Sequence, residues 1–272
     1  MNKNIAVGFI IFHEDEDFYS KLELLLNNNI PVFLYDNSPN KIRSKDFLKL
    51  RNDSFCYLTS GGNAGLGVGL TSLSSKAFNK EYDHLLFFDQ DTKFSIETIN
   101  FTMQLAQSEF YKKYAAVSFS EMNFFSASNS ELSLINPLCS VKETVLIRNS
   151  GTLFNLQDLK KINWFNKDFF VEGVDYEFCL RCLNHKLKLA LINNVPGFDH
   201  ESDQGNANYK IFGLNLIGRK YPKQRIREVC LSSIQLIYLG LRNFKILFVL
   251  FILRNNGLFL IKQMLLRIAK LN

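Results

Sequence analysis

The chain has 272 residues, 47% hydrophobic and 21% charged, a composition ordinary for a globular protein of one or two domains. Its formal net charge is +6, but the segment from residue 219 onward carries eleven Lys or Arg and one acid, a net +10 that leaves residues 1–218 at −4. A tail both basic and apolar favours an anionic membrane surface as partner and disfavours nucleic acid. The five scattered cysteines include one Cys-x-x-Cys pair with no second pair and no nearby His pair, which argues against a zinc or redox site.

Apolar runs that alternate with helical patterns organise the first half of the chain. The predicted strands are 5–12, 31–35, 55–59 and 85–88, and the predicted helices are 18–27 and a glycine-opened helix that ends near residue 80. This β–α alternation is typical of a parallel, doubly wound sheet flanked by helices. No signal peptide precedes the first strand-like run, so the expected compartment is the cytoplasm.

The second half is less regular. It predicts a helix at 95–107, a strand at 115–119, a loop over the sheet edge at 120–143, short strands at 144–148 and 151–156, a helix at 174–185 and a strand at 187–192. We expect one domain over residues 1–220 and a helical tail over 221–272.

The tail is rich in Leu, Ile and Phe. Its longest uncharged run, Val229 to Leu241, is too short to cross a membrane, and Arg242 and Lys245 interrupt the sequence that follows. This pattern favours basic amphipathic helices lying in the membrane interface. Helices that pack on the preceding domain, or on a second copy of the chain to form a homo-oligomer, are the alternative.

Polar residues follow three of the predicted strands. Asp36 follows the second strand, a glycine-rich stretch follows the third, and Asp89 and Asp91 follow the fourth. Because ligands of open α/β sheets bind at the carboxyl ends of the strands, a nucleotide site is expected there. Asp89 and Asp91 repel each other, so a divalent metal that carries a diphosphate is the natural occupant. A polar turn in which Asp caps a helix is the structural alternative.

Two common motifs fit poorly. The glycine-rich stretch lacks the last glycine of a dinucleotide fingerprint, because Leu70 stands there, but Asn63-Ala64-Gly65 opens a helix whose free N–H groups could meet an anion or a sugar. The nucleophile loop of haloacid-dehalogenase-like phosphatases would begin at Asp89, but it expects Thr or Val where Lys93 stands.

A third cluster lies in the predicted helix 174–185. Glu177 and Arg181 are four residues apart and can form an ion pair. Asp175 lies in the first turn, where it either stabilises the helix dipole or serves as a general base. His200, in a polar loop after the last strand, either is solvated or completes a metal site begun by Asp91.

Together these residues resemble glycosyltransferase family 2, and within it the bacterial rhamnosyltransferase-like group, over roughly residues 5 to 220. The resemblance rests on Tyr35-Asp36-Asn37-Ser38, on Asn63-Ala64-Gly65, on Leu86 to Thr92 as the DXD motif, on Ser150-Gly151, and on Phe170 to Arg181. Glu172 stands where Asp is common in that group, and Phe178 where Trp is common. The resemblance implies a GT-A fold, an α/β architecture with a mostly parallel central sheet flanked by helices, followed here by a C-terminal amphipathic helical extension.

The resemblance also implies roles for individual residues. Asp175 corresponds to the catalytic base, and Asp91 and His200 to the ligands of Mg²⁺ or Mn²⁺, with Asp89 facing the donor sugar. The implied donor-binding residues are Asp36, Asn63, Gly65, Asp89, Gln90 and Asp91. The residues implied on the acceptor side or in support of the site are Ser150, Gly151, Glu172, Glu177 and Arg181.

The implied activity is an inverting transfer of rhamnose from dTDP-rhamnose to a lipid-linked glycan, as in O-antigen and lipopolysaccharide biosynthesis. The enzyme would work at the inner face of the plasma membrane, held there peripherally by its tail. A galactofuranosyl or other hexosyl transferase that uses a UDP-sugar remains an alternative. A non-catalytic sugar-nucleotide-binding protein and a phosphatase with Asp89 as nucleophile also remain open.

Overall fold

The computed structural model describes residues 5–13, 16–39, 54–120, 139–199, 207–211, 214–268 and 270–271. His200 lies outside the described residues, as does most of the predicted loop 120–143.

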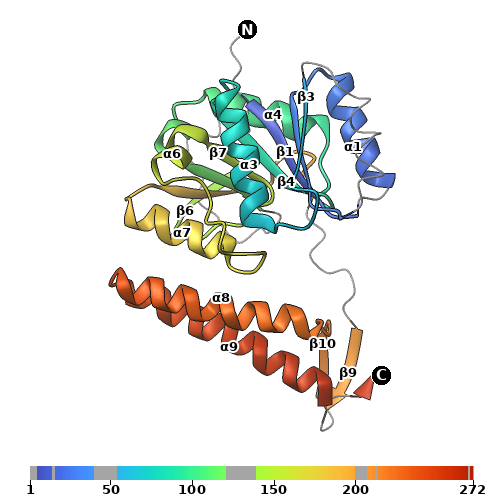
Figure 1. Ribbon diagram of the computed structural model, residues 1–272, viewed down its shortest axis with the longest axis vertical. Coiled ribbons are helices and arrows are strands. Elements are labelled where there is room, and N and C mark those ends of the chain that lie inside the picture. Colours follow the sequence, from blue (N-terminus) through green and yellow to red (C-terminus); the bar gives the residue numbers. More distant parts are fainter. Residues whose placement is uncertain are drawn as a thin grey trace.

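An eight-stranded sheet in the order β3-β2-β1-β4-β7-β5-β8-β6 forms the centre of the upper part of the molecule in Figure 1. The strands are β1 (Ile5–Ile11), β2 (Val32–Asp36), β3 (Phe55–Thr59), β4 (His84–Asp89), β5 (Ala116–Ser120), β6 (Ser140–Thr144), β7 (Thr152–Asn155) and β8 (Leu189–Asn193). The elements around them are α1 (Glu16–Asn27), α3 (Leu66–Asn79), α4 (Ile96–Gln107), the 3₁₀ turn η1 (Tyr111–Lys113), α6 (Leu156–Lys161) and α7 (Val174–Asn184).

The sheet is mostly parallel, as predicted. Strands β3, β2, β1 and β4 run parallel, and so do β5 and β8. β7 lies between β4 and β5 and is antiparallel to both, and β6 is antiparallel to β8 at the edge. The predicted α/β architecture with flanking helices is therefore confirmed.

Burial on both faces explains why β4 reads as an unbroken apolar run. Leu86 and Phe88 belong to the core cluster on one face, Leu85 and Phe87 to the cluster on the other, and all four are fully buried. Beyond the strand, Phe88 stacks on Phe94 with ring centroids 4.4 Å apart. The turn that carries Asp89 and Asp91 is thus anchored on a central strand.

One predicted strand is misplaced. The segment predicted as strand 144–148 is irregular after Thr144, and β6 instead occupies Ser140–Thr144, almost entirely within the predicted loop 120–143. Lys142 and Glu143 are exposed on this edge strand, so its polar sequence hid the strand pattern.

The C-terminal region is a helical hairpin of α8 (Lys223–Arg242) and α9 (Ile246–Ile268), which lie side by side (Figure 1). The predicted C-terminal helical extension is therefore present, and α8 begins two residues into the predicted tail 221–272. Leu236, Phe248 and Ile252 of the hairpin join the core cluster that contains Phe178 of α7. The hairpin therefore packs on the large sheet's domain through α7.

A second, three-stranded sheet was not anticipated. It has the order β10-β9-β11, with β9 (Ala207–Ile211), β10 (Leu214–Gly218) and β11 (Lys270–Leu271). Because β11 pairs with β9, chain segments on both sides of residue 220 share this sheet. The division into 1–220 and 221–272 stays a prediction.

Within the described residues, α9 is the helix long and apolar enough to cross a membrane by length and composition, and 17% of its apolar window is buried. The sequence had suggested that Arg242 and Lys245 interrupt this region. In the structure Arg242 ends α8 and Lys245 lies in the connecting turn, so the apolar helix starts after both cations.

Candidate active site

Ser150 holds the turn at the end of β4. The backbone N–H of Asp89 donates to Ser150 Oγ at 2.8 Å, and the same oxygen lies 2.7 Å from Thr92 Oγ1. Thr92 is fully buried, so its hydroxyl is committed to this contact. Thr92 was absent from the predicted site residues, although its place next to the two acids was the available signal.

Gly151, the next residue, has a left-handed backbone conformation that favours glycine. Its φ is +67°, and a Cβ there would lie 2.5 Å from Phe198 Cζ. Its N–H donates to the Phe87 carbonyl at 2.9 Å, which fixes the loop beside β4. Ser150 and Gly151 therefore hold the Asp89–Asp91 turn in place through hydrogen bonds to the end of β4.

Gln90 and Asp91 differ in their surroundings. The Gln90 side-chain oxygen accepts from the Phe12 N–H at 2.7 Å, and its carbonyl accepts from Lys21 Nζ at 2.6 Å. Gln90 thus ties the ends of β1 and β4 together, while Asp91 is exposed at the turn. Asp91 is the acid of this turn that is open to a ligand.

Asp36 is engaged within the protein. It is 1% exposed, and its carboxylate accepts from the Ser38 N–H at 2.7 Å and from the Tyr57 hydroxyl at 2.8 Å. Asp36 therefore holds the Asp36–Ser38 turn in shape, and direct contact with a nucleobase or ribose stays a prediction.

The loop that opens α3 is fixed by Asn37, a residue absent from the predicted site. The Asn37 side chain accepts from the Ala64 N–H at 3.1 Å and donates to the Gly65 carbonyl at 3.4 Å. Asn63 is exposed, and its side-chain oxygen accepts from the Gly65 N–H at 3.1 Å. Two asparagines and one glycine thus hold this loop, and the polar turn after β2 was the signal for Asn37.

Gly65 brings this loop against the segment that leads into α7. Its φ is +89°, and a Cβ there would lie 2.6 Å from the Phe170 carbonyl oxygen. That oxygen accepts from the Leu66 N–H at 2.5 Å. The close approach joins the α3 loop and the Phe170–Arg181 segment, which are more than a hundred residues apart.

Asp175 is the second residue of α7, after Gly173 in the left-handed conformation. Its side chain accepts from the Tyr176 N–H at 2.9 Å. The pKa of Asp175 is raised to about 6, chiefly by burial; the backbone hydrogen bonds and Arg148 act to lower it, and the Glu172 charge acts to raise it. A carboxyl with this pKa is ionised at neutral pH and remains basic enough to accept a proton.

Asp89 shares an electrostatic environment with both other acids. Its pKa is raised to about 7, chiefly by burial and also by the charges of Asp91 and Asp175, while the Ser150 side chain lowers it. The structure therefore brings together three predicted acids, Asp89, Asp91 and Asp175. Arg148, which acts on Asp175, was missed because nothing in the local sequence distinguishes it.

The acids suit a divalent cation, but the described part of the chain holds only part of a ligand set. No group of three or more His, Cys, Asp or Glu side chains in the described residues could hold a metal. Asp89 and Asp91 supply carboxylate oxygens, which Mg²⁺ and Mn²⁺ prefer, and a cation would offset their mutual repulsion. The Asp199 backbone pairs with Lys93 at 3.0 and 2.9 Å, two residues after Asp91. The predicted ligand His200 follows Asp199 but lies outside the described residues.

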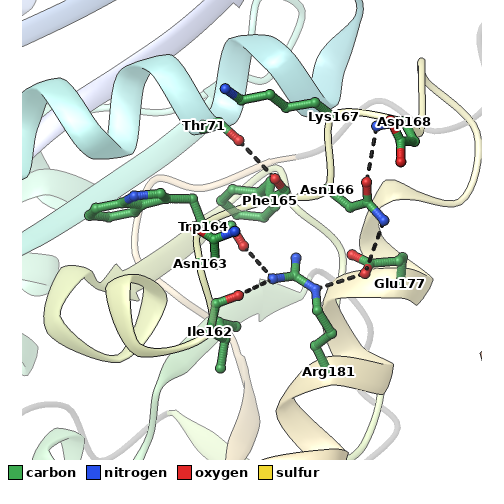
Figure 2. Close-up of a pocket in the computed structure, with 10 residues that line it drawn as sticks. All are labelled: Thr71, Ile162, Asn163, Trp164, Phe165, Asn166, Lys167, Asp168, Glu177 and Arg181. Carbon is green, nitrogen blue, oxygen red and sulfur yellow. Dashed lines mark hydrogen bonds and ion pairs between the residues drawn. The ribbon is translucent and has the colours of Figure 1, made fainter. Parts of the chain in front are cut away.

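Glu177 and Arg181 form the predicted ion pair, with Arg181 Nε 2.7 Å from Glu177 Oε1 (Figure 2). Arg181 Nη1 also donates to the carbonyls of Ile162 and Trp164, at 2.5 and 2.6 Å. The pair borders a cavity of about 520 Å³ next to α3. Its observed contacts tie α7 to the 162–164 turn, which is a supporting role.

Comparisons with known proteins agree with this architecture. No protein-family profile matches the chain. The chain is 22% identical over 240 residues to the dTDP-rhamnosyl transferase RfbF of Shigella flexneri, an alignment that covers 79% of this chain and 74% of RfbF.

Two solved structures are similar in fold. S. aureus TarS 1–349 has a TM-score of 0.51 and 11% identity, over 86% of this chain and 65% of TarS 1–349. GalNAc-T7, solved with UDP, GalNAc and Mn²⁺, has a TM-score of 0.54 and 10% identity, over 70% of this chain and 43% of that chain. The chain thus spans less than two thirds of either structure, and at these identities the likeness shows the GT-A fold.

Proposed function

We propose that the chain is an inverting, metal-dependent glycosyltransferase that moves rhamnose from dTDP-rhamnose to a lipid-linked glycan. The observation that supports this most directly is the placement of Asp175 at the start of α7, within electrostatic reach of the Asp89–Asp91 turn on the central strand. The GT-A fold and the similarity to RfbF favour the same activity. A role in O-antigen or other cell-surface polysaccharide assembly is part of this proposal.

The chemistry follows from the three acids. The Asp175 carboxylate accepts the proton of an acceptor hydroxyl as that oxygen bonds to the anomeric carbon. The bond from the anomeric carbon to the diphosphate oxygen breaks in the same displacement, so the configuration inverts. Asp91 would hold Mg²⁺ or Mn²⁺, which would neutralise charge on the diphosphate. Asp89 would face the donor sugar.

A binding screen tests the donor. We expect dTDP-rhamnose, with Mn²⁺ present, to bind more tightly than UDP-sugars in calorimetric titrations, because RfbF is named for that donor. Each titration is repeated without metal, so that the difference in donor affinity gives the contribution of the cation. Preferential binding of UDP-galactofuranose or another UDP-hexose would replace the donor assignment. No binding of any nucleotide sugar would overturn the proposed function.

We also propose that the tip of the α8–α9 hairpin binds an anionic membrane surface. Phe244 and Leu247 at the tip are 89% and 83% exposed; Arg242 precedes them and Lys245 lies between them. Apolar side chains beside cations suit the boundary between acyl chains and anionic headgroups. Such docking would place the enzyme peripherally on the inner leaflet, near a lipid-linked acceptor.

Point variants test this docking better than deletion, because Leu236 and Ile252 of the hairpin are buried in the shared core. We expect Phe244→Asp with Leu247→Asp to abolish co-sedimentation with phosphatidylglycerol vesicles. Val145→Asp, at a 58% exposed apolar residue outside the hairpin, should bind like the unmodified chain. Undiminished sedimentation of the double variant would contradict the proposal. So would a dimer of the unmodified chain that the double variant dissociates, since the tip would then bind a second copy.

A further inference from the structure

The C-terminal hairpin contacts the turn just before the proposed base. Arg225 Nε in the first turn of α8 lies 2.7 Å from Glu172 Oε1, three residues before Asp175. The Arg225 guanidinium also lies over the Tyr221 ring, 4.3 Å from its centroid. This second contact restricts the long Arg225 side chain and so favours the ion pair.

The same helix packs on the N-terminus of α7. Gly173 has a φ of +86°, and a Cβ there would lie 3.1 Å from Leu236 Cδ1 and 3.2 Å from Ser232 Cβ. Leu236 is fully buried at this contact. Helix α8 therefore packs against Gly173, the residue that precedes α7 and lies two positions before Asp175.

Helix α9 contacts the residue that follows Asp175. The Tyr176 ring lies edge-on to Phe251, with centroids 5.8 Å apart and an interplanar angle of 80°. The Asn255 side chain of the same helix lies close enough to Tyr176 to lower the pKa of its hydroxyl. Residues on both sides of Asp175 are thus held by the hairpin.

We infer that the α8–α9 hairpin is part of the catalytic apparatus, in which Arg225 and Phe251 are positioning residues for Asp175. Arg225 acts through Glu172 and Phe251 acts through Tyr176. This inference rests on the proposed role of Asp175 as base. The hairpin would then have a second role beside membrane docking. The surface that faces α7 orients the base, while the tip is exposed.

The charges around Asp175 give this inference a measurable consequence. The described groups that act on it or face it are Glu172 on the preceding turn, Arg148 on the loop before β7, Tyr176 and Cys179 on α7, and Asp89 on β4. Arg225 offsets the charge of Glu172. Loss of Arg225 therefore leaves a bare negative charge near Asp175, which stabilises the protonated form of the base.

The test measures dTDP-rhamnose hydrolysis with Mn²⁺, in the absence of vesicles, as a function of pH. For Arg225→Met we expect kcat to fall about threefold to tenfold with donor KM unchanged, because the base is less well oriented. The low-pH side of the kcat profile, where activity falls as the base is protonated (the acid limb), should move up by about half a pH unit. This is the order of shift expected for one charge at an exposed pair. Glu172→Gln should move the limb down, and the double variant should follow Glu172→Gln because Arg225 acts through Glu172.

Arg227→Met is the matched control, since Arg227 is an exposed cation on the same helix. It should leave kcat and the acid limb unchanged. An unshifted limb in Arg225→Met, or equal changes in Arg225→Met and Arg227→Met, would overturn the inference.

Hydrogen exchange separates this inference from the proposed function. Amides of residues 172–178 should exchange faster in Arg225→Met and in Phe251→Ala, and at the unmodified rate in Arg227→Met. If the unmodified chain turns over no donor, the proposed function fails, while exchange still decides whether the hairpin orders this segment. Exchange that rises equally across the whole chain in both variants would mean general destabilisation and would overturn the inference.

Discussion

Replacing Asp175 with asparagine is expected to slow sugar transfer by about 10²–10⁴-fold, the usual contribution of a general base. Donor affinity should stay close to that of the unmodified chain, because the amide keeps the shape of the carboxyl and the donor is expected to bind at the Asp89–Asp91 turn. The measurement is transfer or hydrolysis of dTDP-rhamnose, together with a calorimetric titration of the same donor. Asp168→Asn, at an exposed acid on the turn before α7, is the control and should retain activity. Retained transfer in Asp175→Asn would refute the assignment of the base.

The pH dependence follows from the same residue. Since burial raises the pKa of Asp175 from 3.8 to about 6, activity should fall as pH falls through about 6 and the base becomes protonated. A raised carboxyl pKa means that the folded state binds the proton more tightly than the unfolded state. The corresponding stability is present below about pH 4 and is lost as pH rises through about 6. Asp175→Asn should therefore lose this pH dependence, which urea unfolding at pH 4.5 and 7 would measure.

Replacing Asp91 with alanine is expected to abolish metal-dependent donor binding. Asp91 is exposed on the turn after β4, whereas Gln90 is occupied by Phe12 and Lys21. Loss of this ligand should weaken the affinity for dTDP-rhamnose with Mn²⁺ by about 100-fold or more, since even outer-shell changes at metal sites cost about 10–100-fold. Titrations with and without Mn²⁺ should then give the same weak affinity.

Asp168→Ala is the control for this experiment and should keep the metal effect. A Mn²⁺-dependent gain in donor affinity that survives in Asp91→Ala would show that other residues hold the cation. Because Asp91→Ala acts on binding and Asp175→Asn on the chemical step, the two variants should differ in KM and kcat. That difference would separate the two acids experimentally.

The supporting contacts explain why these acids can act together. Ser150 bonds the backbone of Asp89, and the Phe170 carbonyl meets the loop that opens α3. Together these contacts relate three chain segments, around residues 65, 89 and 175, that are far apart in sequence. Displacement of any of these contacts would alter the distance between the donor and the base. The contacts of the hairpin with Glu172 and Tyr176 would affect the proposed reaction for the same reason.

Local sequence predicted most of the elements around the large sheet and the positions of the candidate site residues along the chain. The apolar run before Asp89 predicts a strand buried on both faces, and β4 is that strand. Asp36 ends β2, Asp89 ends β4 and Asp91 follows it. These positions follow from strand lengths and turn residues, which depend on neighbours in the chain. The pairing of Glu177 with Arg181 was equally local, because four residues make one helical turn.

Tertiary structure decided what depends on partners distant in sequence. β7 runs antiparallel between β4 and β5, and β6 forms from polar residues at the edge, because each strand depends on the strand beside it. The bonds that commit Gln90 to Phe12, Ser150 to Asp89 and Arg225 to Glu172 join residues 78, 61 and 53 positions apart. Nothing within any one segment encodes such a contact, since it arises when the core packs. The sequence thus determined where the candidate acids lie along the chain, and packing determined which residues hold them in place.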